Sequence, residues 1–253
     1  MSDIKFLEPI LEGLLQDANT LSVVVVGSFS RGEENYFSDV DLHVIVKNGH
    51  RMHQILYLEN RLININFLDK ENRESALHDP WMTIRNLAAI REANILFDPE
   101  GWYADLQRRT REFDWQEVAQ AANLAVSWVM AENAETVQKI LGGLRDDNSE
   151  KTLRATVDLM DRLANVGALV NGVLANSENR LWSSIRDAEA DSIWKTLFWK
   201  ALGLEAETVV SRARASLHLY CRTAVLYSDK LLPDHAAIVQ QVCAFVESEI
   251  PEQ

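Results

Sequence analysis

Two aspartates, Asp39 and Asp41, stand at the start of an apolar segment, and their type and spacing suit metal-assisted chemistry. On a β-strand, residues i and i+2 point to the same side, so these two carboxylates are expected to converge. Converging carboxylates offer the oxygen ligands that Mg²⁺ binds together with waters and substrate phosphates. The pair therefore predicts a magnesium site at which a triphosphate is neutralised and oriented for in-line displacement.

A second motif, Gly27-Ser28, ends the preceding apolar segment. Gly27 lacks a Cβ atom, which lets the backbone approach a phosphate closely, and Ser28 supplies a hydroxyl and an amide donor. Each motif alone is common in proteins. A buried strand followed by Gly-Ser, a polar loop and Asp-x-Asp is a rarer combination, and it favours a nucleotide-binding site. The further candidate nucleotide contacts are Ser30, Arg31 and Ser38.

The segments around these motifs alternate between helix and strand patterns. The expected elements are a helix at 4–15 and strands at 21–26, 41–46 and 61–68. The short stretch 52–57 is ambiguous. Residues 93–98 are expected to connect this region to the helical remainder of the chain, because Pro80 and Pro99 punctuate the transition.

The pattern becomes helical after Trp81 and stays so to the end of the chain. Gly142-Gly143, followed by polar residues, predicts a break between two helices. The long amphipathic stretches are 115–141, 151–174, 191–201, 205–229 and 234–248. The patterns thus predict an α+β chain, with a small α/β domain over residues 1–110 and an all-helical domain over residues 111–253.

The segment VVVVGSFSRGEENYFSDVDLHVIV, from Val23 to Val46, resembles the signature of the DNA polymerase β nucleotidyltransferase superfamily. Within it, GSFSRGEENYFSDVDL is similar to the aminoglycoside and lincosamide nucleotidyltransferases. The similarity is sharp over this segment. The strand order, the stretch from Ile95 to Gly101 and the following helices are similar in outline only.

The resemblance implies a nucleotidyltransferase domain with a mixed β-sheet and helices, followed by a helical substrate-binding bundle. Gly27 and Ser28 would hold the triphosphate of ATP or another nucleotide, and Asp39 and Asp41 would bind Mg²⁺. Such enzymes transfer a nucleoside monophosphate, commonly AMP, to a hydroxyl of the antibiotic and release pyrophosphate.

The same resemblance implies a third carboxylate on a neighbouring strand. In the segment 61–68, the apolar side is formed by Ile63, Ile65 and Phe67, so the polar, site-facing side should be Asn64 and Asn66. An amide can ligate a metal weakly or hold a water. It cannot accept the proton of an attacking hydroxyl.

Three explanations of the missing carboxylate stay open. The general base comes from the helical region, where Glu132 and Glu135 lie and Glu132 is the catalytic candidate. Alternatively, Glu59 takes the role through local geometry, or Asp69 does so through a bulge. In the third explanation the chain has lost catalysis and keeps nucleotide or ligand binding, as an antitoxin-like regulatory module would.

The charge of the chain bears on its partners, because 38 acidic residues against 25 basic ones give a formal net charge of −13. A nucleic-acid binder needs a basic surface, so nucleic acid is not expected as a partner. An acidic protein attracts cationic ligands. This favours a small cationic hydroxylated substrate of the aminoglycoside type over a nearly neutral lincosamide.

The remaining features indicate an ordinary cytoplasmic protein. The apolar runs are too short to cross a bilayer, and Met1 to Lys5 lacks the basic start of a secretory signal. Cys221 and Cys243 are the only two cysteines, which argues against a disulfide framework and against a zinc site. The expected assembly is a monomer or a homodimer.

Overall fold

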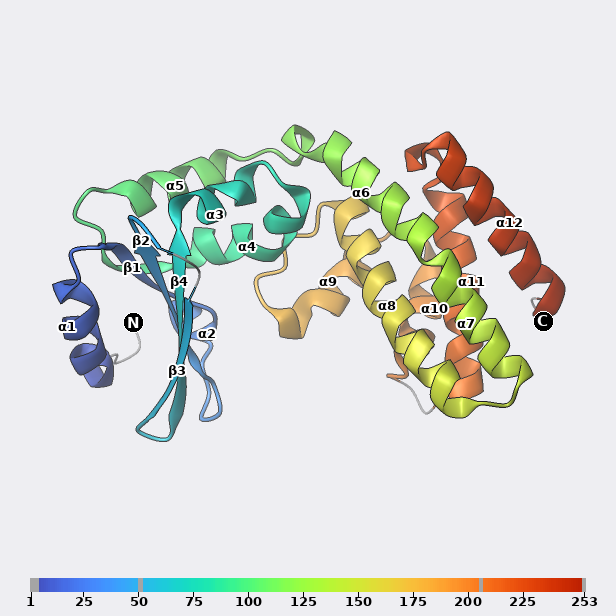
Figure 1. Ribbon diagram of the computed structural model, residues 1–253, viewed down its shortest axis with the longest axis horizontal. Helices are drawn as coiled ribbons and strands as arrows, with labels where there is room; N and C mark the ends of the chain where they lie inside the picture. The colour runs from blue at the N-terminus through green and yellow to red at the C-terminus, as the bar shows by residue number, and fades with distance from the viewer. Residues whose placement is uncertain (1–4, 50–51, 205–206, 252–253) are drawn as a thin grey trace. The chain divides into compact units, whose positions relative to one another are not determined.

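The computed structural model describes residues 5–49, 52–204 and 207–251, and it divides into two compact units. Unit 1 runs to Val118 and also includes the later segment Leu174–Arg180. Unit 2 comprises Ala119–Val173 and the chain from Leu181 onward. The sheet belongs to unit 1, and the described part of unit 2 contains helices and no strands (Figure 1). The predicted α+β class is confirmed. The domain limits 1–110 and 111–253 stay a prediction.

Unit 1 is built on a five-stranded mixed sheet with the order β3-β4-β2-β1-β5. The strands are β1 Thr20–Val26, β2 Val40–Val46, β3 Met52–Leu58, β4 Arg61–Asp69 and β5 Asn94–Phe97. Strands β2 and β4 are parallel, and the other neighbouring pairs are antiparallel. The ends of β1 and β3 therefore lie beside the starts of β2 and β4. Asp39 and Asp41 lie at this end of the sheet.

Two strands differ from the sequence expectations. The ambiguous stretch 52–57 forms β3, which pairs with β4 through a turn at Glu59 and Asn60, both with positive φ. The connecting stretch 93–98 contains β5, which pairs with β1 at the other edge. With four residues, β5 is too short to show a period, and its hydrogen bonds come from the open edge of β1.

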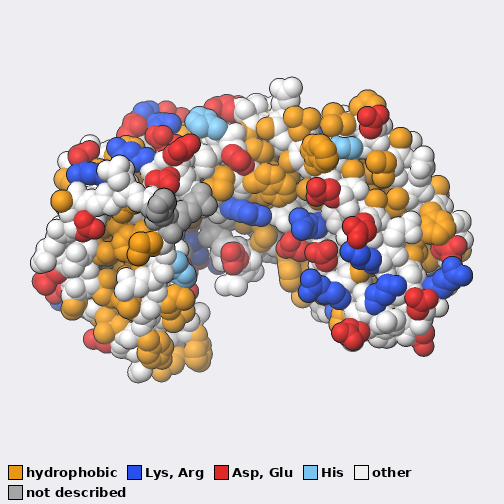
Figure 2. Space-filling model, in the orientation of Figure 1, with side chains coloured by type: hydrophobic (Ala, Val, Ile, Leu, Met, Phe, Trp, Pro, Cys, Tyr) orange, Lys and Arg blue, Asp and Glu red, His pale blue; other side chains and the backbone are white. Residues whose placement is uncertain are grey.

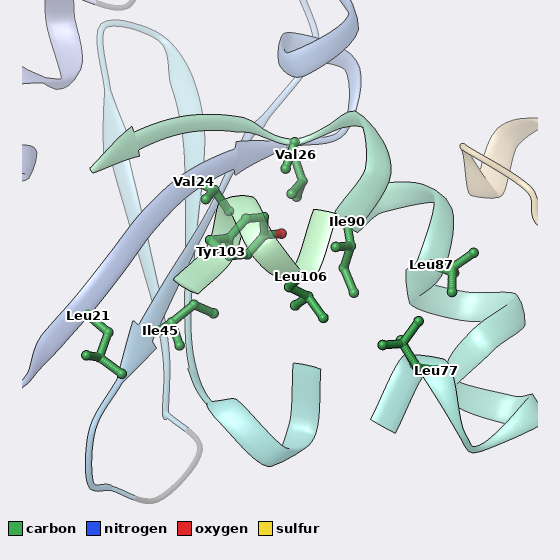
Figure 3. Close-up of a cluster of buried hydrophobic side chains, with 11 residues drawn as sticks. Leu21, Val24, Val26, Ile45, Leu77, Leu87, Ile90, Tyr103 and Leu106 are labelled. Atoms are coloured by element: carbon green, nitrogen blue, oxygen red, sulfur yellow. The ribbon is translucent and has the colours of Figure 1, made fainter. Parts of the chain in front are cut away.

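The two faces of the sheet bury different side chains. One face packs against α1 (Glu8–Gln16) and α2 (Ser28–Arg31). Its core consists of Leu7, Val23, Val25, Phe29, Val40, Leu42, Val44, Val46, Ile63 and Ile65. The other face packs mainly against α4 (Pro80–Glu92) and α5 (Trp102–Glu112), as Figure 3 shows. Its core includes Leu21, Val24, Val26, Ile45, Leu77, Leu87, Ile90, Tyr103 and Leu106. A short helix, α3 (Lys70–Glu74), follows β4.

Side-chain caps fix where several helices of unit 1 begin. Asp69 accepts from Asn72 N at the start of α3, and Asp79 accepts from Trp81 N at the start of α4, where Pro80 takes the first helical position. Asp114 begins a capping box with Glu117, three residues later. These caps follow directly from the local sequence.

Unit 2 is a set of helices that begin after Val118. The helices are α6 Ala119–Glu132, α7 Ala134–Arg145, α8 Ser149–Asn171, α9 Leu181–Ala188, α10 Ser192–Leu202, α11 Val209–Leu226 and α12 Pro233–Glu249. The expected helix 115–141 is divided at Asn133. The break predicted after the glycine pair falls at residues 146–148, between α7 and α8, and the pair itself lies in the last turn of α7. A Cβ atom on Gly143 would stand 2.5 Å from Thr152 Oγ1 of α8, so the glycine allows close packing of these two helices. Among the described residues, no helix is long and apolar enough to span a membrane.

Candidate nucleotide site

The carboxylates of Asp39 and Asp41 converge on one side chain of the neighbouring strand. Asn64 donates from Nδ2 to Asp39 Oδ2 at 2.7 Å and to Asp41 Oδ1 at 3.2 Å. The register of the parallel pair explains this meeting, since Asp41 is the direct partner of Asn64. The alternation of side chains along β4 predicted that Asn64 faces the site. The structure agrees, because both aspartates lie on that face.

Gly27 brings the chain close to the same carboxylates. It has φ +76° and ψ −150°, a conformation that only glycine adopts without strain. A Cβ atom at this position would stand 2.9 Å from Asp41 Oδ2. Gly27 is therefore needed both for the turn from β1 into α2 and for the space that Asp41 occupies.

The surroundings of Asp41 raise the pKa of its carboxyl group. Burial raises the pKa of this carboxyl, the neighbouring Asp39 raises it further, and Glu178 adds a smaller effect in the same direction. The hydrogen bond from Asn64 and the nearby His53 act in the opposite direction. Two carboxylates whose repulsion is only partly relieved by an amide favour the arrival of a cation.

Asn66 lies one pleat further along the same face. Its cross-strand partners are His43 on β2 and His53 on β3. Burial and then the charge of Arg73 hold the pKa of His43 well below its ordinary value, so this histidine is a neutral side chain within the fold. Asn66 therefore stands at the border between the carboxylate pair and the buried interior.

Three of the predicted nucleotide contacts, Ser30, Arg31 and Ser38, bond to other residues of unit 1. Ser30 donates from Oγ to Gly27 O, and Ser38 Oγ accepts from Asn35 N. Arg31 is largely buried and bridges to Glu33 and Glu92 at 2.9 and 3.6 Å. These bonds stabilise the loop between α2 and β2. Phosphate contacts of Ser28, Ser30, Arg31 and Ser38 stay a prediction.

A segment distant in the sequence completes this part of unit 1. Arg31 Nη1 donates to Asn176 O at 2.9 Å, and Arg180 lies 3.5 Å from Glu33. The segment Leu174–Arg180 thereby brings Glu178 near Asp41. The sequence did not predict this contact, because no local pattern reveals a contact made across more than a hundred residues.

Of the candidate bases in the first third of the chain, Asp69 lies at the far end of β4 from the pair, and the role of Glu59 stays a prediction. Asp69 is the last residue of β4 and caps α3, and the register of β4 shows no bulge that turns it toward the site. The proposed bulge is thus absent. Glu59 is exposed in the turn after β3. Glu132 and Glu135 are exposed in unit 2, at the end of α6 and the start of α7, and their role stays a prediction.

The described residues contain no cluster of three or more His, Cys, Asp or Glu side chains arranged to hold a metal ion. The candidate oxygen ligands are thus the two carboxylates, and Asn64 is the third polar side chain beside them. This set can hold a divalent cation only with help from phosphate oxygens, waters or the amide oxygen of Asn64.

Comparison with known proteins identifies a similar domain and a similar fold. Residues 7–94 match the model of the family described as nucleotidyltransferase domain, a region that covers β1 to β4 and leaves unit 2 outside it. The chain is similar to the solved structure of a nucleotidyltransferase-like protein from Exiguobacterium sibiricum. The two are 17% identical with a TM-score of 0.53 over 97% of this chain and 88% of the other, a likeness of fold alone. No curated protein matches the chain.

Proposed function

We propose that this chain binds a magnesium–nucleoside triphosphate complex in unit 1 and transfers its nucleoside monophosphate to a hydroxyl group. The match of residues 7–94 to a nucleotidyltransferase domain supports nucleotide transfer in general. The observation that carries the proposal is the meeting of Asp39 and Asp41 directly beside Gly27. A triphosphate needs such a combination of a close backbone approach and a cation-binding pair.

The side chains fit a divalent cation, because the carboxylates of Asp39 and Asp41 converge on one point. Burial and then the charge of Asp39 raise the pKa of Asp41, and a bound cation would relieve both effects. A rotation of the Asn64 amide by half a turn would present its oxygen in place of the donating nitrogen. When bound, the metal supplies neutralisation of phosphate charge and orientation of the α-phosphate.

The residues of this chain have separate tasks in the transfer. Gly27 and Ser28 hold the leaving phosphates through backbone and hydroxyl donors. Asp39 and Asp41 would hold the divalent cation and orient the α-phosphate through it. The acceptor oxygen forms a bond to the α-phosphorus, while the bond from that phosphorus to the bridging oxygen breaks. Pyrophosphate leaves with the electron pair, and the hydroxyl proton passes to a base or to water.

The finer assignment within this proposal is transfer of AMP from ATP to an aminoglycoside-type antibiotic in the cytoplasm, with a monomer or homodimer as the active form. Its support is the segment Gly27–Leu42, which is similar to that group of enzymes, and the net charge of −13. A lincosamide is the alternative acceptor, with the same chemistry at the hydroxyl.

A second candidate function is binding without transfer. Asn64 favours it, because an amide bonded to both aspartates stabilises the pair and supplies no base. In this case the chain acts as a nucleotide-binding regulatory module, and Mg-ATP binds without being consumed.

The decisive experiment has two parts with one protein sample. Calorimetry with ATP and Mg²⁺ measures binding, and mass spectrometry of an aminoglycoside and lincosamide panel looks for the mass gain of AMP. Transfer is expected in the wild type, with loss of at least about a hundredfold in Asp39→Asn, since that variant removes one of the two carboxylates that would hold the cation at the reacting phosphate. Full activity in Asp39→Asn would show that the site is wrongly assigned. Binding without an adduct on any drug would favour the second function.

A further inference from the structure

Three exposed apolar side chains stand beside the carboxylate pair. Ile55 and Tyr57 of β3 are 56% and 72% exposed, and Leu62 of β4 is 41% exposed. Ile55 pairs with Asn64, and Tyr57 pairs with Leu62. Cross-strand partners lie on the same face, so these three residues, here called the apolar wall, continue the face on which Asn64 meets the aspartates.

Folding of unit 1 does not account for the apolar wall. On the opposite face of the same strand, Leu56 and Leu58 pack against the core. The buried cluster on the wall's own face includes no residue of β3. Figure 2 shows hydrophobic side chains gathered at the end of unit 1 where the β3–β4 hairpin and the loop between α2 and β2 lie in Figure 1. An edge strand ordinarily carries charged residues, which these positions lack.

The order of the strands places the apolar wall and Gly27 on opposite sides of Asp41. Strand β2, which carries Asp41, lies between β1 and β4. Gly27 follows β1 on one side of β2, and the wall lies on β4 and β3 on the other side. The attacking and leaving oxygens of a phosphoryl transfer lie roughly in line through the phosphorus. If pyrophosphate leaves on the Gly27 side, the acceptor hydroxyl enters from the side of the wall.

We propose that the apolar wall binds an apolar or aromatic part of the acceptor, placed directly next to the hydroxyl that receives the nucleotide. This inference rests on the proposed transfer of a nucleoside monophosphate to a hydroxyl, and it names an amphiphilic substrate class in place of the polar aminoglycoside type. The acceptor is amphiphilic: a hydroxyl oxygen bonds to the α-phosphorus, pyrophosphate leaves, the proton is released, and an adjoining apolar surface covers Ile55, Tyr57 and Leu62. A uniformly polar polycation would leave the apolar wall exposed to water.

The experiment uses the full chain and three small probes in saturation-transfer NMR. Benzyl alcohol carries a hydroxyl next to an aromatic ring, glycerol carries hydroxyls alone, and 2-deoxystreptamine carries hydroxyls with two amines. The test variant combines Ile55→Thr, Tyr57→Thr and Leu62→Thr, since threonine keeps a strand and the positions are exposed. The matched control is Phe245→Gln on α12, where a 41% exposed aromatic side chain is removed in unit 2.

Benzyl alcohol is expected to bind the wild type and the control, and to bind the triple variant at least about tenfold more weakly, because even one apolar side chain contributes that much when it is covered. Mn²⁺–ATP added to the wild type should also speed the relaxation of bound benzyl alcohol, because the wall adjoins the metal site. Asp39→Asn should abolish this relaxation and leave the binding of benzyl alcohol unchanged.

Four results would overturn the inference. They are equal binding of benzyl alcohol to the triple variant, preference of the wall for 2-deoxystreptamine, no relaxation by bound Mn²⁺–ATP, and conversion of a dimer to a monomer in the triple variant. The last would show that a second copy covers the wall. Failure of Mn²⁺–ATP to bind, while benzyl alcohol still binds at the wall, would instead overturn the proposed function.

Discussion

Replacing Asn64 by aspartate should turn a stabilising contact into a repulsive one. The wild-type amide donates to Asp39 at 2.7 Å and to Asp41 at 3.2 Å. A hydrogen bond to a charged group contributes about 1.5–3 kcal/mol, and the shorter bond carries most of this. A third carboxylate in the half-exposed site adds roughly 1–2 kcal/mol of repulsion, well below the unscreened Coulomb value. The free energy of unfolding should fall by about 3–5 kcal/mol without divalent cations.

The assay is amide hydrogen exchange of peptides from β2 and β4 at pH 7 in a chelator, because it reports on unit 1 separately from the helices of unit 2. Asn64→Leu is the matched control, since it removes the hydrogen bonds without adding charge. Repulsion raises the carboxyl pKa values of folded Asn64→Asp, so the folded state holds more protons and stability falls as the pH rises. The deficit relative to Asn64→Leu should therefore shrink toward pH 4.

Mg²⁺ should reverse the same deficit, by about 2.7 kcal/mol at a hundred times its dissociation constant. Equal exchange of Asn64→Asp and Asn64→Leu at pH 7, with no effect of Mg²⁺ on either, would refute the reasoning. It would mean that the two aspartates and position 64 do not form one electrostatic site.

Three further predictions concern the neighbours of the pair. Gly27→Ala should destabilise unit 1 by about 2–4 kcal/mol in urea unfolding, through backbone strain and the clash with Asp41. In an Asp41→Ala background this cost should fall by about 1 kcal/mol, because the clash is removed. Strict additivity of the two substitutions would contradict the contact. Arg31→Met should speed hydrogen exchange of residues 174–180 at least about tenfold, because its bond to Asn176 is lost; unchanged exchange would show that other contacts hold the segment. Glu178→Gln should lower the pKa of Asp41 in carboxyl NMR, so that less stability is lost as the pH rises through that pKa; an unchanged titration would place Glu178 too far away to act.

The sequence predicted the local part of the site and not its long-range part. Gly27, Asp39 and Asp41 lie within one strand–loop–strand segment, so their spacing and the period of a strand suffice to bring them together. The same period placed Asn64 on the correct face. The approach of Glu178 depends on how the chain returns to unit 1 after α8, and no period or motif encodes that return.

The net charge and the apolar wall act on an acceptor at different stages of binding. The charge of −13 acts at long range, where it raises the encounter rate of cations and is screened by salt over about 10 Å. The wall acts only in contact, where it changes how slowly a bound molecule leaves. An acceptor with both an amine and an apolar group next to its hydroxyl benefits from both effects. The overall acidity therefore says how ligands reach this protein, whereas Ile55, Tyr57 and Leu62 decide which of them stay long enough to react.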